Sequence, residues 1–544
     1  MLVLKNYLAS PDAHPLVRRF ATALPLLILS IPSLYLLLTL PPLWRDSDGF
    51  NEIASTFAPK GIIHWLPGYC LVGRLIVFAG SIVGSLLGGH GMPYLSISIT
   101  PLNDAGIYLL IVVQHGFLVF SLFYSVTTLS DRLPNRVLLA LFFALTPWVY
   151  IYANCIGSEA FSNPLVYLIA ACGWTCLKTS ELGRRRVLIY FGLLLAAALT
   201  RQINSLLAAL LPIALLPLAG QELVLGGGRS NSGDSPPRFR YMRRLLIFVL
   251  VGLSAIGISV LVQQAMCWLF RVPFRSTFGE TFEWRLSYLA GMKEEERTAI
   301  LGQLATKGGD PVVTEALESL NQSLIRGDKW IDMFLFYKID EILLRSGLNE
   351  MQHRTWQIDL KLNRIAAGVL LSGEPHFRKA VLTDFKRWPF FTQTDLAYPP
   401  FILTDWLQTQ LPIARYGRLR GLASFQHQEG YYTAAWNKFP YGHLFGGISM
   451  LVTGGLTMLL GGWAFAGAQR DPLTKAGVSY AASLIAVGVL ISFANCLSTF
   501  YGARFYLPVY TLFQMGLLLV ISLVGKFFME RLGRERLESF KNPR

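Results

Sequence analysis

Long apolar runs separated by short polar segments dominate the pattern of the sequence. An α-helix of about 20 apolar residues is long enough to cross the hydrocarbon core of a bilayer. The strongest candidates for such spans are residues 20–43, 105–127, 137–152, 164–177, 245–268, 444–465, 477–497 and 505–524. Another run, 187–218, is interrupted by a polar segment around Arg201 and predicts a tight hairpin of two short helices. The pattern therefore predicts an all-α polytopic membrane protein.

Basic residues cluster in the polar segments between these runs. Lysine and arginine close to membrane spans remain on the cytoplasmic side. This rule places six clusters there: Lys5 with Arg18 and Arg19, Arg132 with Arg136, Lys178 with residues 184–186, the segment 229–244, Arg470 with Lys475, and the tail 526–544. The eight spans and the hairpin then give ten crossings, with both termini in the cytoplasm, only if the apolar stretch 68–87 does not cross. We therefore predict that 68–87 is a re-entrant or interfacial helix, consistent with its glycines and Arg74.

The same parity argument places five segments on the noncytoplasmic side. They are the first outer loop 44–104, the turn 153–163, the turn at Arg201, the region 271–441 and the turn 498–504. The region 271–441 holds more than half of the acidic residues, interleaved with bases and with apolar positions at helical spacing. This composition predicts a mostly helical extracytoplasmic domain inserted into the membrane bundle.

These boundaries divide the chain into four parts. Residues 1–268 form an N-terminal transmembrane module, and 269–441 form the extracytoplasmic domain. Residues 442–525 supply the C-terminal transmembrane helices, and 526–544 form a basic cytoplasmic tail. The loop 226–240 is rich in glycine, serine and proline, which predicts a flexible cytoplasmic linker.

Composition supports the membrane class and excludes others. Of the 544 residues, 53% are hydrophobic and 15% are charged, whereas soluble proteins carry about 25% charged residues. This excludes an ordinary cytosolic enzyme and a disordered chain. The net charge of +15 follows from the clusters beside the spans, so it does not indicate a nucleic-acid partner. All six cysteines lie in or beside apolar stretches, without disulfide-framework or zinc spacing.

The first candidate for chemistry directly follows the first span. The segment Trp44-Arg45-Asp46-Ser47-Asp48-Gly49-Phe50-Asn51-Glu52-Ile53-Ala54 holds two carboxylates two residues apart at the membrane edge. Asp46 and Asp48 are placed there to meet a lipid headgroup. The alternative is that they cap the following helix or are solvated loop charges.

A second candidate lies at the entry to the stretch 68–87, where the chain reads H-W-L-P-G-Y from His64. Aromatic residues and prolines at this depth are typical of membrane-interface anchors. His64 is a candidate for binding a phosphate or an acceptor, and the alternative is a structural role.

The third candidate combines Thr146-Pro147-Trp148-Val149-Tyr150-Ile151-Tyr152 with Gly157-Ser158-Glu159-Ala160-Phe161. Pro147 is expected to end or kink its helix near the outer face. Glu159 falls in a short outer turn, where a carboxylate so close to hydrocarbon is costly unless it is paired. Its expected partner is Arg201 or Arg504.

Arg201 and Arg504 form the fourth candidate, within Leu199-Thr200-Arg201 and Ala503-Arg504-Phe505-Tyr506-Leu507-Pro508. Guanidinium groups stay charged and bind phosphate bidentately, which suits a lipid phosphate or pyrophosphate. The alternative is that both arginines snorkel to lipid headgroups.

Tyr152 and Tyr506, together with His64, are candidates for substrate binding. The sequence contains no GxxxxGK[ST], GxGxxG, HExxH or GxSxG motif, so nucleotide-driven transport, zinc proteolysis and serine hydrolysis lose support.

In their order along the chain, these motifs resemble the GT-C fold membrane glycosyltransferases. The similarity is to the branch of protein mannosyltransferases and aminoarabinose transferases. It rests on W-x-D-x-D-G-F-x-x-I-A, H-W-L-P-G-Y, T-P-x-x-x-x-Y, S-E-A-F, L-T-R and A-R-F-Y-L-P, and covers about residues 16–220 and 440–525. The resemblance implies a GT-C-like bundle with juxtamembrane helices after the first span.

The resemblance also implies roles for the candidate residues. Asp46 matches the first-loop aspartate, the general base or acceptor-orienting carboxylate, and Asp48 supports it or binds a divalent metal where members use one. Glu159 matches the family's second acidic motif, although Ala160 stands where proline is usual. Arg504 matches the arginine that holds the donor phosphate. The domain 271–441 has no counterpart in the best-known members, which leaves the acceptor open.

The resulting hypothesis is an integral membrane glycosyltransferase. It would transfer a sugar from a polyprenyl-phosphate donor to a hydroxyl of a lipid, glycan or protein acceptor on the noncytoplasmic face. No cofactor beyond such a metal is implied, and membrane lipids are the other partners. Compact cytoplasmic loops favour the bacterial inner membrane, with the active site facing the periplasm.

Three alternatives remain open at this stage. A lipid-linked polysaccharide polymerase or O-antigen ligase would also use outer arginines, but on a pyrophosphate donor. A transporter would place ionisable groups near the bilayer midplane, where only Gln114 and His115 stand out. A receptor or scaffold would not need ten crossings.

Overall fold

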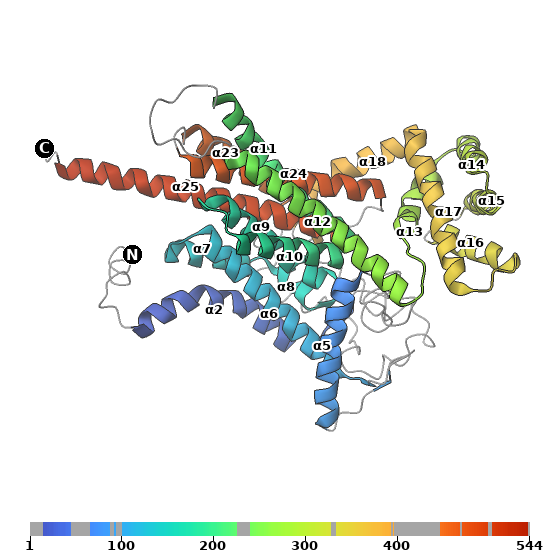
Figure 1. The fold of residues 1–544 in the computed structure, drawn as a ribbon, viewed down its shortest axis with the longest axis horizontal. Helices are drawn as coiled ribbons and strands as arrows, with labels where there is room; N and C mark the ends of the chain where they lie inside the picture. The colour runs from blue at the N-terminus through green and yellow to red at the C-terminus, as the bar shows by residue number, and fades with distance from the viewer. Residues whose placement is uncertain are drawn as a thin grey trace.

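The computed structural model describes residues 15–44, 66–87, 92–93, 101–225, 240–327, 333–392, 395–396, 447–467, 471–498 and 503–541. Within them the chain is an all-α membrane protein (Figure 1). Seven of the described helices are long and apolar enough to cross a membrane, and three shorter apolar helices accompany them. The predicted fold class is therefore confirmed.

The bundle is built from helices that follow the predicted apolar runs. They are α2 (Pro15–Thr39), α5 (Pro67–Leu86), α6 (Asp104–Leu129), α7 (Leu133–Ala144), α8 (Pro147–Ala153), α9 (Glu159–Lys178), α10 (Arg184–Thr200), η2 (Gln202–Ala209), α11 (Leu210–Leu225), α12 (Arg240–Leu269), α23 (Met450–Gly467), α24 (Pro472–Ser498), η6 (Ala503–Tyr506) and α25 (Leu507–Lys541). The predicted hairpin is present, because α10 ends at Thr200 and the chain turns back through η2 and α11. The last helix continues through the segment predicted as a tail.

The span predicted over 137–152 is two helices. α7 ends at Ala144, and α8 starts at Pro147. Proline lacks the N–H that an uninterrupted helix would need there, while its fixed φ suits the first turn of a new helix. The break predicted at Pro147 is therefore confirmed, and it lets α8 approach the turn that leads into α9.

α9 is the central helix of the bundle. Nearly all of its apolar span is buried, at 94%, because it is apolar or small on every face rather than on one stripe. Its polar side chains are satisfied by neighbouring helices: the Tyr167 hydroxyl donates to Gln514 of α25. Gly173 leaves room for Tyr480 of α24, whose hydroxyl donates to the Ala170 carbonyl at 2.8 Å.

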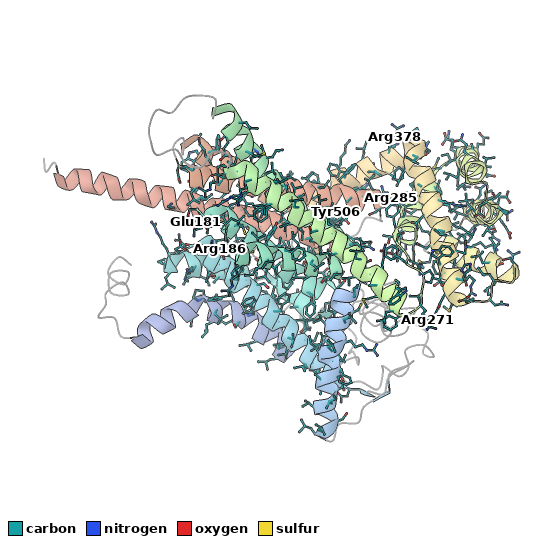
Figure 2. The ribbon with its side chains drawn as sticks, viewed as in Figure 1. Glu181, Arg186, Arg271, Arg285, Arg378 and Tyr506 are labelled. Carbon is teal, nitrogen blue, oxygen red and sulfur yellow. The ribbon has the colours of Figure 1, made fainter. Side chains whose placement is uncertain are left out.

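The basic residues of the described segments 132–136, 178–186 and 240–244 gather at one end of the bundle. There Lys178 at the end of α9 binds Asp131 beyond the end of α6 at 3.1 Å. Arg244 in the first turns of α12 donates to the carbonyls of Thr179 and Ser180. Figure 2 shows Arg186 at this end and Arg271, which follows α12, at the other. We call these the basic end and the opposite end of the bundle.

α5 lies across the opposite end of the bundle. By length and composition it could cross a membrane, but both of its ends contact the same end of the bundle. Near its start, Gly68 packs on the backbone at the end of α10, where a Cβ would meet Leu199 at 2.7 Å. Near its end, Gly84 packs on Ala105 at the start of α6, where a Cβ would meet the alanine Cβ at 2.6 Å. In Figure 1 α5 runs steeply across the direction of α6 and α12. Its position as a re-entrant or interfacial helix in the membrane stays a prediction.

A separate layer of helices follows α12 at the opposite end (Figure 1). It comprises α13 (Phe278–Glu283), η3 (Trp284–Gly291), α14 (Glu294–Gly308), α15 (Pro311–Ile325), α16 (Phe334–Arg345), α17 (Met351–Ser372), α18 (Pro375–Arg387) and η4 (Trp388–Phe390). We call it the helical domain. Leu317, Ile339 and Leu362 are among its fully buried side chains. The described part of the predicted domain is thus helical, and residues 397–446 lie outside the described residues.

Candidate functional site

Two short strands bring the start of the chain to the head of α9. β1 (Leu43–Trp44), which follows α2, pairs in parallel with β4 (Cys155–Ile156), which precedes α9. The Leu43 amide donates to the Asn154 carbonyl at 2.9 Å. Because β1 ends at Trp44, the acidic segment of the first outer loop begins beside the turn that carries Glu159.

Buried polar side chains from α5 and α6 hold this turn in place. Gln114 donates to the carbonyls of Ala153 and Cys155 at 2.9 and 3.0 Å. The Tyr69 hydroxyl donates to Gln114 at 3.0 Å and accepts from the Gly157 amide at 3.0 Å. These bonds satisfy backbone groups that a turn inside a bundle would otherwise leave unpaired.

His115 extends the same support toward α2. Its Nδ1 lies 3.0 Å from the Ser33 hydroxyl, and its Nε2 lies 3.3 Å from the Asn154 side-chain oxygen. Asn154 in turn donates to the Pro41 carbonyl at 2.7 Å. Gln114 and His115 therefore pack the bundle and fix the turn, which favours the packing interpretation of these residues over a transport site.

Glu159 and Arg201 form a buried ion pair at the head of α9. Arg201 Nη1 lies 3.1 Å from Glu159 Oε1, and the two side chains are 15% and 0% exposed. Glu159 is the first residue of α9, where a carboxylate also interacts favourably with the helix dipole. Arg201 reaches it from the junction between α10 and η2, where the backbone is extended. The pairing expected from the sequence is present, with Arg201 as the partner.

Two asparagines flank this ion pair, and sequence reasoning missed the function of both. Asn204 of η2 donates to the Ser162 hydroxyl at 3.0 Å and to the Ala197 carbonyl at 3.1 Å, which joins the hairpin to the first turn of α9. Asn163, which follows Ser162 on α9, is 2% exposed. Neither its amide nitrogen nor its amide oxygen has a hydrogen-bond partner among the described residues. The available signal was polar residues at the edge of an apolar run.

Tyr152 and Tyr506 are both buried in the core at 1% exposure. Tyr506 stacks on Trp388 of the helical domain, with ring centroids 6.3 Å apart and an interplanar angle of 5°. Its hydroxyl lies 3.3 Å from Cys496 Sγ. Figure 2 places Tyr506 where the bundle meets the helical domain. These contacts give Tyr506 a packing role, and its role in substrate binding stays a prediction, as does that of Tyr152.

The remaining candidates lie partly or wholly beyond the described residues. Asp46, Asp48 and His64 are outside them. The backbone of Arg504 lies in η6, and its side chain is outside them. The turn that carries it is held by Asn495, whose side chain donates to the Phe505 carbonyl at 2.9 Å.

The described residues contain no group of three or more His, Cys, Asp and Glu side chains that could hold a metal ion. Asp46 and Asp48 lie outside the described residues, so the divalent metal stays a prediction. What the described geometry offers is a carboxylate and a guanidinium brought together in a place largely shielded from water. Because water is largely excluded there, the pair interacts more strongly with any charged group that reaches it than it would in water.

Comparisons with known proteins give a weak structural likeness. No protein-family model matches the sequence, and no curated protein matches it. A similar solved structure is the archaeal oligosaccharyltransferase AglB from Archaeoglobus fulgidus, in complex with an inhibitory peptide and a dolichol-phosphate. The TM-score is 0.38 and the identity 11%. The match covers 97% of this chain but 52% of that protein, so this chain spans about half of its length.

Proposed function

We propose that this protein is an integral membrane glycosyltransferase of the GT-C type. It transfers a sugar from a polyprenyl-phosphate donor to an acceptor hydroxyl at the opposite end of the bundle, which the positive-inside rule places outside the cytoplasm. The bacterial inner membrane, with the site facing the periplasm, is the proposed location. The supporting observation is the buried Glu159–Arg201 ion pair beside the strand that leads to Asp46.

Chain connectivity supports the assignment of Asp46 to a site beside that pair. It follows Trp44 by two residues, and two residues of extended chain span at most about 7 Å. Trp44 is paired with Ile156, three residues before Glu159. A carboxylate delivered here meets the head of α9 from the lipid-headgroup side, which suits a substrate whose chain stays in the bilayer.

In the proposed reaction, the oxygen of the acceptor hydroxyl forms a bond to the anomeric carbon of the sugar. At the same time Asp46 accepts the proton of that hydroxyl. The bond from that carbon to the phosphate oxygen breaks, and polyprenyl phosphate leaves with the electron pair. Arg504 and Arg201 balance the charge on the leaving phosphate. A guanidinium carries five N–H donors. The contact of Arg201 Nη1 with Glu159 therefore orients the guanidinium and leaves other N–H groups for the phosphate.

Asp46→Asn tests this assignment. General-base help contributes about 10²- to 10⁴-fold to a rate, so sugar transfer by the purified variant should fall by about that factor. Its melting temperature in detergent should stay at the wild-type value, because asparagine fills nearly the same volume. Transfer is measured with a radiolabelled polyprenyl-phosphate sugar and detected in the acceptor fraction.

Asp131→Asn is the matched control, since Asp131 lies at the basic end and binds Lys178 with its side chain 79% exposed. It should transfer sugar as the wild type does. Normal turnover by Asp46→Asn removes Asp46 from the mechanism. Wild-type turnover only with a pyrophosphate-linked oligosaccharide makes the protein a polymerase or ligase, and donor movement across vesicles without transfer makes it a carrier.

A further inference from the structure

The described part of the bundle contains buried hydrogen-bonding groups without partners, near the head of α9. Besides the amide of Asn163, the indole Nε1 of Trp148 has no partner among the described residues, and Trp148 is 0% exposed. Leaving such a group unpaired costs about 1–3 kcal/mol, so folded proteins rarely keep one without a reason. The unpaired amide of Asn163 and indole of Trp148 lie on neighbouring helices of one bundle, which points to a bound ligand that would pair with both.

The packing of α9 and α25 brings these groups to one level. The two helices run parallel: the Tyr167 side chain bonds to Gln514, and further toward the basic end Trp174 and Leu523 both pack against Gly477. Residues four apart share a helix face. Asn163 therefore lies one turn outward from Tyr167, just as Tyr510 lies one turn outward from Gln514.

Trp148 lies at the same depth in the bundle as Asn163, because its ring contacts that of Tyr510. The two rings meet edge to face, with centroids 5.3 Å apart at 79°. Glu159 lies one further turn outward from Asn163 on α9. The unpartnered amide and indole thus lie one helical turn deeper in the bundle than the Glu159–Arg201 ion pair.

We infer that Asn163 and Trp148 bind the sugar of the donor lipid and determine its recognition, an inference that rests on the proposed function. The chemistry of the two groups selects a neutral hydroxylated ligand. An amide donates and accepts, as a sugar hydroxyl requires, whereas the indole only donates and neither carries charge. The rings of Trp148 and Tyr510 supply apolar surface for the C–H face of a sugar. The phosphate remains with Arg201 one turn outward.

The first test compares stabilities without ligand. Asn163→Leu replaces the unpartnered amide by an apolar group of similar size and should melt at or above the wild-type temperature. Asn204→Leu is the matched control: Asn204 is buried in the same region but fully engaged, so this variant should melt clearly lower. A loss for Asn163→Leu equal to that of Asn204→Leu shows a structural amide, served by bound water, and overturns the inference.

The second test measures binding of two probes, farnesyl phosphate and its glucose ester, to full-length protein in detergent. Asn163→Leu should weaken the sugar-bearing lipid about fivefold to tenfold, the worth of a typical hydrogen bond, and leave farnesyl phosphate unchanged. Trp148→Phe, which keeps a ring but loses the N–H, should act in the same direction. Unchanged binding of both lipids, or equal weakening of both, overturns the inference.

These outcomes are distinguishable from a failure of the proposed function. A wild-type protein that discriminates between the two lipids but transfers no sugar refutes the transferase and keeps this sugar site. A wild-type protein that transfers sugar, with an Asn163→Leu variant that discriminates equally well, refutes the site and keeps the transferase.

Discussion

Charged side chains are used differently in the bundle and in the helical domain. In the helical domain they join neighbouring helices: Asp310 before α15 binds Lys361 of α17 at 2.6 Å, and Arg345 of α16 binds Glu315 of α15 at 2.6 Å. In the bundle, Glu159 and Arg201 are joined at the head of α9, beside polar groups that the described residues leave unpaired.

Under the proposed function, the difference separates charges that stabilise a fold from charges that are available to a substrate. In the helical domain the Asp310–Lys361 pair has a clear structural use, because it joins the start of α15 to α17. A buried ion pair near hydrocarbon contributes little net stability, since desolvation offsets most of the attraction. Its presence at the end of the most buried helix is therefore better explained by chemistry than by folding.

The largest effect is expected from Arg201→Ala. Removing the guanidinium leaves the Glu159 carboxylate, which is 0% exposed, without its charge partner, and breaking a buried pair in this way costs about 3–5 kcal/mol. The melting temperature of the purified protein should fall accordingly. Glu159→Gln should cost less, because Arg201 keeps some access to water.

The double variant Glu159→Gln/Arg201→Gln is the control for that experiment. It removes both charges together and should recover most of the stability lost in Arg201→Ala. A melting temperature unchanged by Arg201→Ala would show that the pair is hydrated, and the contrast between the two regions would disappear.

A smaller effect is expected from Asp310→Asn in the helical domain. Asparagine still caps α15, so the variant removes only the charge that faces Lys361 and Arg364. Hydrogen bonds to charged groups are worth about 1.5–3 kcal/mol, and local opening of α15 and α17 at neutral pH should become easier by about that amount. Hydrogen exchange of the full-length protein reports this opening helix by helix.

This difference should depend on pH. Burial alone would raise the pKa of Asp310, but the hydrogen bond and charge of Lys361 outweigh it, so the pKa lies below its ordinary value of 3.8. A lowered pKa contributes stability above the ordinary value, and this stability is lost as the pH falls through the folded-state value. Wild type and Asp310→Asn should therefore converge at acidic pH. An undiminished difference would contradict the role of the charge.

The smallest effect is expected from Arg345→Ala. Arg345 and Glu315 are 55% and 45% exposed, and exposed ion pairs contribute little to stability because water and salt screen them. The variant should melt at the wild-type temperature, and its exchange pattern in α15 and α16 should be unchanged. Marked loosening of these helices would show that a surface pair also holds the helical domain together.

Helices were the part of the fold that the sequence predicted best. Apolar runs marked the helices, whereas the direction of each crossing and the interfacial position of the helix at Gly68 stay predictions. Apolar runs are local features of the sequence, and basic clusters need only be counted along it. Pro147 and Arg201 marked their breaks correctly, since proline and a charge in an apolar run each disfavour a continuous helix in the membrane.

The candidate site was harder to predict. The charge of Glu159 identified it, because a carboxylate near hydrocarbon demands a partner, but two arginines were equally plausible from the sequence. Asn163 and Asn204 escaped attention because an uncharged amide inside an apolar run does not reveal whether it is bonded. Only the packing of helices distant in sequence separates the engaged Asn204 from the unpartnered Asn163.

The pairing of β1 with β4 has a consequence for biosynthesis. It joins residue 43 to residue 155, so it closes only after the intervening helices have been threaded into the bilayer. Long-range contacts of this kind form late, because the entropy of closing the intervening chain must first be overcome. Arg201 emerges from the ribosome later still. A nascent chain therefore lacks the Glu159–Arg201 pair until Arg201 has emerged, and the two side chains meet only when the helices around them are in place.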